Sequence, residues 1–322
     1  MSEFEIFSPV ARELNIVETQ LQESIHSPLD ILHHASVHLV QAGGKRLRPA
    51  FALIAARFYR EDLSEVIPLA TALELLHMAS LVHDDVIDNS DTRRGTHTVK
   101  SAWGNRVSIY TGNFLFARSL SLLADYERRD IVGVLADASM KICEGEIIQM
   151  MSCYNVNLGL KNYLRRIERK TALLISVSCQ VGAMLCNAPQ IEISAHSRYG
   201  YYLGMAFQIT DDILDLVADE KTLGKPTGSD IKQGVITLPA LYALKNGPYS
   251  RELAAMISSP ECCQQDTGRI IDMILESDGI DYAYHITRLY AEKARRQIER
   301  LPDSPLKETY SRITNFITDR DF

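Results

Sequence analysis

The sequence predicts an all-α protein that folds as a single domain over residues 1–322. Glycine and proline are scarce, at 17 and 11 of 322 residues, and apolar residues recur every three or four positions over long stretches. No stretch alternates apolar and polar residues for long enough to build a sheet. The sequence also shows no linker, low-complexity tract or fixed-period repeat that would mark a second domain.

Each predicted helix is defined by apolar residues three or four positions apart. In the first, Val10, Leu14 and Val17 lie on one stripe. The second should end at Gly43–Gly44, because glycine is common just after the last helical residue. In chain order, the predicted helices span 8–24, 28–40, 48–59, 73–95 (ending in a polar turn), 105–125, 130–154, 160–186, 191–219, 240–247, 264–277, 280–300 and 304–318. Residues 96–104 are expected to form a connecting loop, and the glycine-rich and proline-rich residues 223–239 an ordered loop or lid.

The composition is that of a soluble globular protein, with 46% hydrophobic and 23% charged residues. A net charge of −7 gives no nucleic-acid footprint. Basic residues are instead concentrated at Lys45–Arg48, Arg93–Arg94 and Arg165–Lys170, a pattern that favours a small anionic ligand. No uncharged apolar run reaches the roughly 20 residues that span a bilayer, and the acidic, amphipathic N-terminal stretch is not typical of a signal peptide.

The six cysteines form no CxxC pair and no zinc spacing with histidine. Most lie in apolar helical stretches, where a free cysteine behaves as a small hydrophobic residue. A reducing, cytoplasmic compartment is therefore expected.

Two acidic triplets with the same spacing are the main candidates for chemistry: Asp84, Asp85 and Asp88, then Asp211, Asp212 and Asp215. The first and last aspartates of each triplet are four apart and share a helix face, with the middle one offset by about 100°. Carboxylates this close repel one another unless a cation lies among them. Either triplet alone is also typical of a solvated acidic helix end. Two copies, each flanked by apolar residues and followed by a basic loop, favour a shared Mg²⁺–diphosphate site, because Mg²⁺ binds carboxylates together with substrate phosphates.

Basic residues near the first triplet could bind the phosphates. In GGKRLRP (43–49), glycines let the backbone approach a ligand, and Lys45 and Arg48 offer a point charge and a planar fork. An ordinary helix end with solvated cations is an equal alternative for this segment. Arg93 and Arg94 follow the triplet and should point to different sides.

Further candidates surround the second triplet or precede the first. Lys170 and Thr171 interrupt an apolar helix, where an unpaired lysine is costly, so a ligand contact is favoured over a snorkelling side chain. Gln208 lies one turn before Asp212, and Lys225 lies on the following loop. His77 is two turns before Asp84, although a lone histidine there is more often a core group.

Two other histidines, His34 and His38, are four apart but have no third ligand in the sequence, so they are interpreted as structural.

Together these residues resemble the trans-prenyl diphosphate synthases over nearly the whole chain. Both aspartate-rich motifs, GGKRLRP, the RRG after the first motif, RKT, FQ and LGKPTGSD occur in the family's order. The segments HMASLVHDDVID, YLRRIERKTALLISVSCQ and ITLPALYALKN are more similar still to the catalytic large subunit of two-component bacterial heptaprenyl diphosphate synthases.

The resemblance implies an isoprenoid-synthase helical bundle around a central cavity, in which both triplets bind Mg²⁺ and, through it, an allylic diphosphate. Side chains expected to contact that substrate or its developing cation are Arg93, Lys170, Thr171, Gln208 and Lys225. Residues that match the isopentenyl diphosphate site are Lys45, Arg48, His77 and Arg94. The implied partner is a small regulatory subunit, or otherwise a second copy of the chain, with at most peripheral membrane contact and no nucleic acid.

Product length should depend on the helix before Asp84, since one isoprene unit is about as long as one helical turn, roughly 5 Å. Ala79 and Ser80 are small where short-chain members of the family carry an aromatic plug. The resemblance thus implies a heptaprenyl (C35) product from a farnesyl primer, for menaquinone side chains. The alternative interpretation of the two small residues is that they only allow close helix packing. The alternatives are a homodimeric synthase of geranylgeranyl, hexaprenyl or octaprenyl diphosphate, and a non-catalytic helical regulatory subunit.

Overall fold

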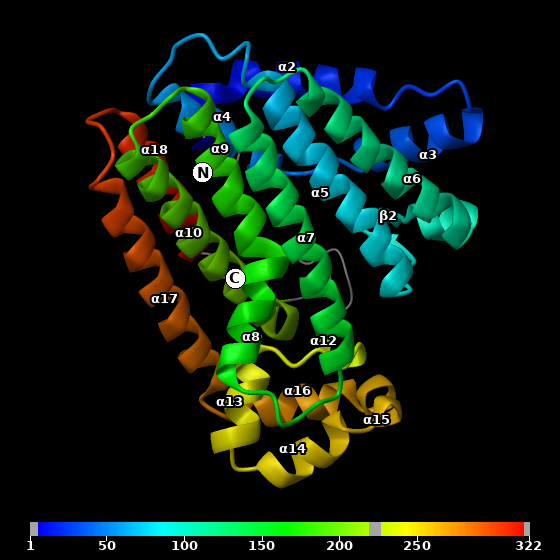
Figure 1. Cartoon of the computed structure of the whole chain (residues 1–322). Coiled ribbons are helices and arrows are strands. Elements are labelled where there is room, and N and C mark those ends of the chain that lie inside the picture. Colours follow the sequence, from blue (N-terminus) through cyan, green and yellow to red (C-terminus); the bar gives the residue numbers. More distant parts are fainter. Residues whose placement is uncertain (1–5, 219–226, 319–322) are drawn as a thin grey trace. The chain divides into compact units, whose positions relative to one another are not determined.

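The computed structural model describes residues 6–218 and 227–318 (Figure 1). The described elements are η1(Ser8–Val10), α2(Ala11–Ser24), α3(Asp30–Gln41), α4(Leu47–Arg57), α5(Ile67–Ile87), β1(Thr92–Arg93), β2(Thr96–His97), α6(Val99–Ala124), α7(Arg129–Ser152), α8(Leu160–Ile167), η2(Glu168–Ala172), α9(Leu173–Leu185), α10(Gln190–Val217), α12(Ser229–Lys232), α13(Leu238–Asn246), α14(Ser250–Ile257), α15(Pro260–Gln265), α16(Thr267–Leu275), α17(Gly279–Ile298) and α18(Leu306–Thr318). The all-α prediction is confirmed, because the strands described form only one two-stranded hairpin.

The predicted loop over residues 96–104 is wrong, because a helix begins within it. Thr98 caps α6 by accepting a hydrogen bond from the backbone N–H of Ser101 at 3.1 Å. The backbone leaves the helical conformation at Gly104, with φ 82° and ψ 167°, so α6 consists of two helical segments joined by a kink. The second segment begins where the sequence pattern predicted a helix, at residue 105.

Other helix boundaries also differ from the predictions. The helix with the first triplet begins at Ile67 and not at Leu73, with a proline in its first turn. Two short helices, α14 and α15, occupy residues that were left without an element. The second of them begins where the Ser259 side chain accepts a hydrogen bond from the N–H of Cys262.

The contacts divide the chain into two compact units. Unit 1 comprises Met1–Ala136, Val177–Ser197 and Arg300–Tyr310. Its core includes α4, which is apolar all round and buried from Pro49 to Ala56, as expected for a helix enclosed by others. The helix α5 is buried from Leu69 to Leu75, including the polar Thr71 and Glu74, and α6 packs along its length (Figure 1).

Unit 2 comprises Asp137–Ser176, Arg198–Glu299 and Ser311–Phe322. One of its clusters packs Tyr163 and Ile167 of α8 against Ile209 and Ile213 of α10. A second cluster joins α13, α14 and α16 around Ile270 and other apolar residues. The first cluster places α8 directly beside the helix that carries the second triplet.

Unit 1 also contains a buried polar network centred on His196, which is 0% exposed. Its Nε2 lies 3.2 Å from the Tyr59 hydroxyl, and its Nδ1 lies 3.0 Å from the Tyr310 hydroxyl. Burial lowers the pKa of His196 from 6.5 to about 3, so the ring is neutral in the folded chain at neutral pH.

Acidification should therefore weaken unit 1 through His196. Because the pKa is lower in the folded state, the stabilising effect is complete above about pH 6.5 and is lost as the pH falls toward 3. Between pH 7.5 and pH 5, the free energy of unfolding of the wild type should fall relative to His196→Gln by about 2 kcal/mol. Urea unfolding followed by circular dichroism would measure this difference, and a gap that does not vary with pH would contradict the assignment.

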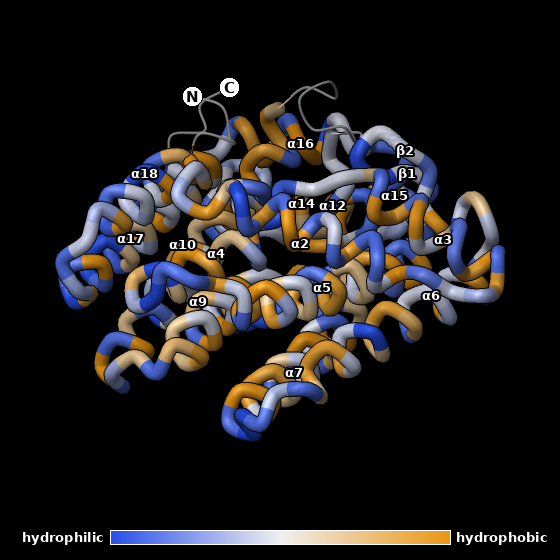
Figure 2. Tube along the Cα trace, turned by 90° about the horizontal axis from the view of Figure 1, so that it is seen from above, coloured by the Kyte–Doolittle hydropathy of each residue, from blue (hydrophilic) through white to orange (hydrophobic). Residues whose placement is uncertain are grey.

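All six cysteines are free thiols, in agreement with the absence of disulfide spacing in the sequence. In the part of the chain that the structure describes, no helix is both long enough and apolar enough to cross a membrane. Hydrophobic residues run along α7 (Figure 2), and Met140, Ile147 and Met151 on this helix are exposed.

Candidate active site

The first triplet lies at the carboxyl end of α5, in unit 1. Asp84 and Asp88 are partly exposed, whereas Asp85 is 2% exposed, so the predicted division between a shared face and an offset residue is confirmed. The helix ends at Ile87 with Asp88 as its C-cap; Asn89 then has a φ of 51°, and the N–H of Ser90 donates to the carbonyl of Asp85. Because the end carbonyls of a helix already carry partial negative charge, three carboxylates here favour a cation.

Arg93 supplies one such charge. The hairpin β1–β2 pairs Arg93 with Thr96 around Arg94 and Gly95, which have φ angles of 53° and 75°. This register directs Arg93 back to α5, where its Nε lies 2.8 Å from Oδ1 of Asp85. Burial raises the pKa of Asp85 above its usual value, and the Arg93 charge partly offsets that effect.

Arg94 points elsewhere, as predicted, and donates a hydrogen bond to the backbone carbonyl of Gly43. The hairpin and the GGKRLRP segment therefore meet. The pKa of His77, which lies near this meeting point, is well below 6.5. Burial of the ring is the main cause, and the charges of Arg48, Arg94 and Arg93 add to it. A neutral histidine among arginines is a setting that favours an anionic ligand.

Arg46, in the same segment, has a structural role. Its guanidinium lies 2.8 Å from Glu18 of α2 and 3.1 Å from Glu74 of α5. Arg46 thus holds two helices together. Lys45 is exposed and Arg48 is partly exposed.

The second triplet lies on α10, in unit 2. Asp211 is partly exposed, but Asp212 and Asp215 are 3% and 1% exposed. Oδ2 of Asp215 accepts a hydrogen bond of 3.1 Å from the backbone N–H of Asp230, on α12. Asp211 is therefore the member of this triplet that is most open to a ligand.

Lys170 and Thr171 lie on η2, a turn of π-helix between α8 and α9. Two glycines let neighbouring helices approach this turn closely: a Cβ on Gly204 would lie 2.5 Å from Cα of Ala172, and one on Gly145 would lie 2.7 Å from Cβ of Arg169. Such π-turns are frequent at functional sites. Here the turn replaces the uninterrupted helix predicted for 160–186.

The approach of α10 to η2 joins Thr171 to the second triplet. The Thr171 hydroxyl donates to Oε1 of Gln208 at 2.5 Å, and Nε2 of Gln208 donates to Oδ1 of Asp212 at 2.8 Å. Nζ of Lys170 lies 3.2 Å from Oε1 of Gln149 on α7 and 3.8 Å from Oε2 of Glu146. The half-buried lysine therefore has partners within unit 2.

Asp212 is also bound from its other side. The Tyr163 hydroxyl donates to Oδ2 of Asp212 at 2.8 Å. Burial and the nearby Asp230 raise the pKa of Asp212, whereas Arg166 and the hydrogen bonds from Gln208 and Tyr163 lower it. Both oxygens of this carboxylate are therefore engaged by side-chain donors.

Sequence reasoning missed Gln149, Tyr163 and Asp230. Gln149 had a usable signal, since EGEIIQ places polar residues at helical spacing in an apolar helix. The other two had none, because their link to Asp212 is tertiary. Lys225 lies outside the described residues. The structural interpretation of His38 is supported by its 2.6 Å hydrogen bond to the carbonyl of His97, and His34 is exposed.

The two candidate chain-length residues differ in their surroundings. Ser80 is partly exposed and lies four residues before Asp84, on a stripe that continues to the partly exposed Leu76. Ala79 is buried, at 2% exposure. Ser80 is therefore the better candidate for a wall facing a bound chain.

A divalent cation suits the donors that both triplets present, because carboxylate oxygens are hard ligands. Within the described residues, no three acidic, histidine or cysteine side chains are gathered closely enough to form a metal site by themselves. Mg²⁺ is usually bound by one or two carboxylates and completed by substrate phosphates and water, so partly exposed aspartates such as Asp84 and Asp211 fit it.

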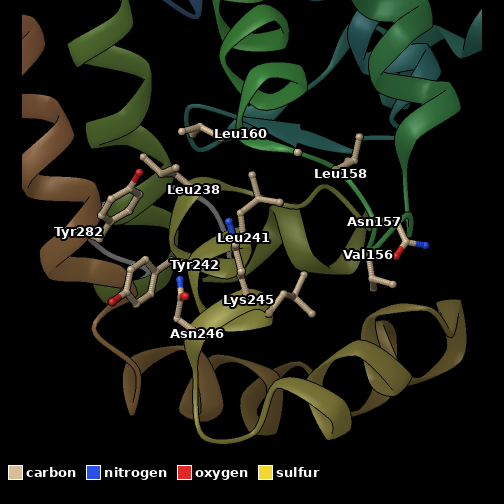
Figure 3. Close-up of a pocket in the computed structure, with 12 residues that line it drawn as sticks. Val156, Asn157, Leu158, Leu160, Leu238, Leu241, Tyr242, Lys245, Asn246 and Tyr282 are labelled. Carbon is tan, nitrogen blue, oxygen red and sulfur yellow. The ribbon is translucent and has the colours of Figure 1, made fainter.

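Unit 2 contains a hollow that is lined by none of the described site residues. Its volume is about 380 Å³, and its lining includes Leu158, Leu241 and Lys245 (Figure 3). The rings of Tyr242 and Tyr282 also line it, and the centres of these two rings are 4.9 Å apart.

Comparison with known proteins identifies the class. The family model described as polyprenyl synthetase matches residues 29–274. The heptaprenyl diphosphate synthase component 2 of Geobacillus stearothermophilus is 44% identical over 317 residues, covering 98% of both chains. The chain belongs to the polyprenyl synthetase family, and it is a prenyltransferase.

Solved structures agree. The heptaprenyl diphosphate synthase of Staphylococcus aureus is 38% identical, with a TM-score of 0.91, covering 97% of this chain and 98% of that one. A polyprenyl synthase from Caulobacter crescentus, crystallised with calcium and isoprenyl diphosphate, is 33% identical with a TM-score of 0.94, covering 99% and 98%.

Proposed function

We propose that this chain condenses an allylic diphosphate, farnesyl diphosphate, with successive isopentenyl diphosphates to give all-trans heptaprenyl diphosphate (C35). The observation that carries the proposal is the pair of acidic triplets near the carboxyl ends of α5 and α10, each with a partly exposed aspartate and basic side chains nearby. Residues 1–322 would act as one functional domain around a cavity that holds the growing chain.

The allylic diphosphate would be bound by both triplets through Mg²⁺, which supplies charge stabilisation to the departing diphosphate. Arg93 and Lys170 would add positive charge beside it. Gln208 presents a second amide hydrogen beyond the one that it donates to Asp212. An apolar, water-poor pocket would protect the allylic cation until the double bond of isopentenyl diphosphate attacks it and a proton is lost.

Isopentenyl diphosphate would bind among Lys45, Arg48 and Arg94, around His77. The pKa of His77 is lowered first by burial and then by the charges of Arg48, Arg94 and Arg93. A neutral imidazole can donate one hydrogen bond to a phosphate oxygen while it adds no repulsion to the surrounding arginines. Lys225 would close the allylic site from its loop.

The C35 product is proposed because two similar proteins, from Geobacillus stearothermophilus and Staphylococcus aureus, bear the name heptaprenyl diphosphate synthase. Ser80 supports it, since a small, partly exposed residue one turn from Asp84 leaves room for a long chain. Such a product would serve a menaquinone side chain, made in the cytoplasm with at most peripheral membrane contact.

A small partner subunit is proposed as well, because the relative with 44% identity is named component 2. Exposed apolar residues on α6, including Ile109, Tyr110, Phe116 and Leu120, support an interface there. If a second copy of this chain occupies that face instead, the enzyme would be a homodimer with its own product length.

The test is to incubate the purified chain with farnesyl diphosphate, radiolabelled isopentenyl diphosphate and Mg²⁺, with and without a candidate small subunit, and to size the product by chromatography. We expect C35 product only when the subunit is present. Product formed by the chain alone would support the homodimer, and its length would decide among geranylgeranyl, hexaprenyl and octaprenyl. Absence of prenyl transfer under every condition, and of Mg²⁺-dependent binding of an allylic diphosphate analogue, would favour a regulatory subunit.

A further inference from the structure

Tyr163 has no role in the proposed reaction, yet its hydroxyl contacts the second triplet. It lies on α8, is 1% exposed, and directs its hydroxyl to Oδ2 of Asp212. The guanidinium group of Arg166 lies over the face of the Tyr163 ring, with its central carbon 5.4 Å from the ring centre. Arg166 is in turn fixed by a 2.8 Å hydrogen bond to the carbonyl of Ile236.

The hydrogen bonds around Asp212 form a continuous chain. The Tyr163 hydroxyl and the Gln208 amide both donate to the carboxyl oxygens of Asp212. The amide oxygen of Gln208 faces the Thr171 hydroxyl, which donates to it. The hydrogen bonds therefore run from Tyr163 through Asp212 and Gln208 to Thr171.

We infer that Tyr163 is a positioning residue of the active site: through Asp212 it sets the side-chain orientation of Gln208 and Thr171, the groups proposed to meet the allylic diphosphate. The inference rests on the proposed function. It also makes Asp212 the anchor of this hydrogen-bonded chain. Asp211, the partly exposed neighbour, keeps the ligand role.

The variant Tyr163→Phe tests this, because it removes one hydroxyl and retains the buried ring and its contact with Arg166. Tyr199→Phe is a matched control. Tyr199 is also a fully buried tyrosine of unit 2, and its hydroxyl lies 3.4 Å from Oγ1 of Thr314, away from the chain around Asp212. Circular dichroism and thermal unfolding would verify that both variants fold.

The first readout is binding of inorganic pyrophosphate with Mg²⁺, measured by calorimetry on the chain itself. Tyr163→Phe should weaken it by about 10-fold or more, as for other residues that orient a ligating group, and Tyr199→Phe should leave it unchanged. In steady state, with any subunit that the enzyme requires, Tyr163→Phe should raise the KM for the allylic diphosphate or lower kcat by about 10–100-fold. The KM for isopentenyl diphosphate should not change.

The second readout is a double-mutant cycle with Asp212→Asn. If Tyr163 acts through Asp212, the double variant should be no weaker than Asp212→Asn alone. Wild-type pyrophosphate binding by Tyr163→Phe, a loss equal to that of Tyr199→Phe, or additive losses in the cycle would overturn the inference while leaving the proposed function intact. A wild type that binds no pyrophosphate would overturn both.

Discussion

Replacing Asp84 by asparagine should lower turnover by about 100-fold or more. Asp84 is partly exposed at the carboxyl end of α5, on the same face as Asp88. Asparagine keeps the size and one oxygen but removes the negative charge that would hold a cation against the departing diphosphate. Steady-state assays of prenyl transfer over a range of Mg²⁺ concentrations would measure the loss, which excess Mg²⁺ should restore only in part.

Asp91→Asn is the control for that variant. Asp91 follows the same helix, but it is exposed and lies 2.9 Å from Nζ of Lys100, an arrangement typical of a surface ion pair. This substitution should leave activity close to that of the wild type. Near-normal turnover of Asp84→Asn would remove Asp84 from the metal site.

Enlarging Ser80 should shorten the product from C35 to about C20 or less, because one helical turn matches roughly one isoprene unit. Ser80 lies one turn before Asp84 on the partly exposed stripe of α5, so Ser80→Phe places a ring where a bound chain would pass. Product sizing by chromatography is the measurement. An unchanged product length in a folded, active variant would refute the hypothesis that side chains along α5 limit the length of the product.

Ala79→Tyr is expected to act in the same direction but at a cost in stability. Ala79 is 2% exposed, and adding bulk to a packed core typically destabilises a protein by about 1–3 kcal/mol. Its melting temperature should therefore fall more than that of Ser80→Phe. Comparing the two variants distinguishes a product shortened because the tunnel is blocked from one shortened because the helix is disturbed.

Periodicity alone predicted the long helices because their burial repeats at helical spacing over several turns. It predicted the short helix at 240–247 but not α14 or most of α15. It placed residues 96–104 in a loop, whereas Thr98 caps a short helical segment that begins at Val99 and ends at the break at Gly104.

The candidate site divides in the same way. Local spacing identified Asp84 and Asp88 because residues four apart on a helix share a face. It could not separate the role of Arg46 from that of Arg48, since the difference arises from the left-handed backbone at Arg46, which directs its side chain to Glu18. Nor could it connect Tyr163 with Asp212, which lie 49 residues apart and meet only where α8 packs on α10.

The central claim is that both triplets share one metal–diphosphate cluster. A crystal structure of the chain with Mg²⁺ and a non-reactive allylic diphosphate analogue would test it most directly. Oxygens of Asp84 and Asp211 should each lie about 2.0–2.1 Å from Mg²⁺ ions that bind the same diphosphate. Mg²⁺ ions bound at only one triplet, or a diphosphate bound to the ions of neither triplet, would contradict a shared cluster.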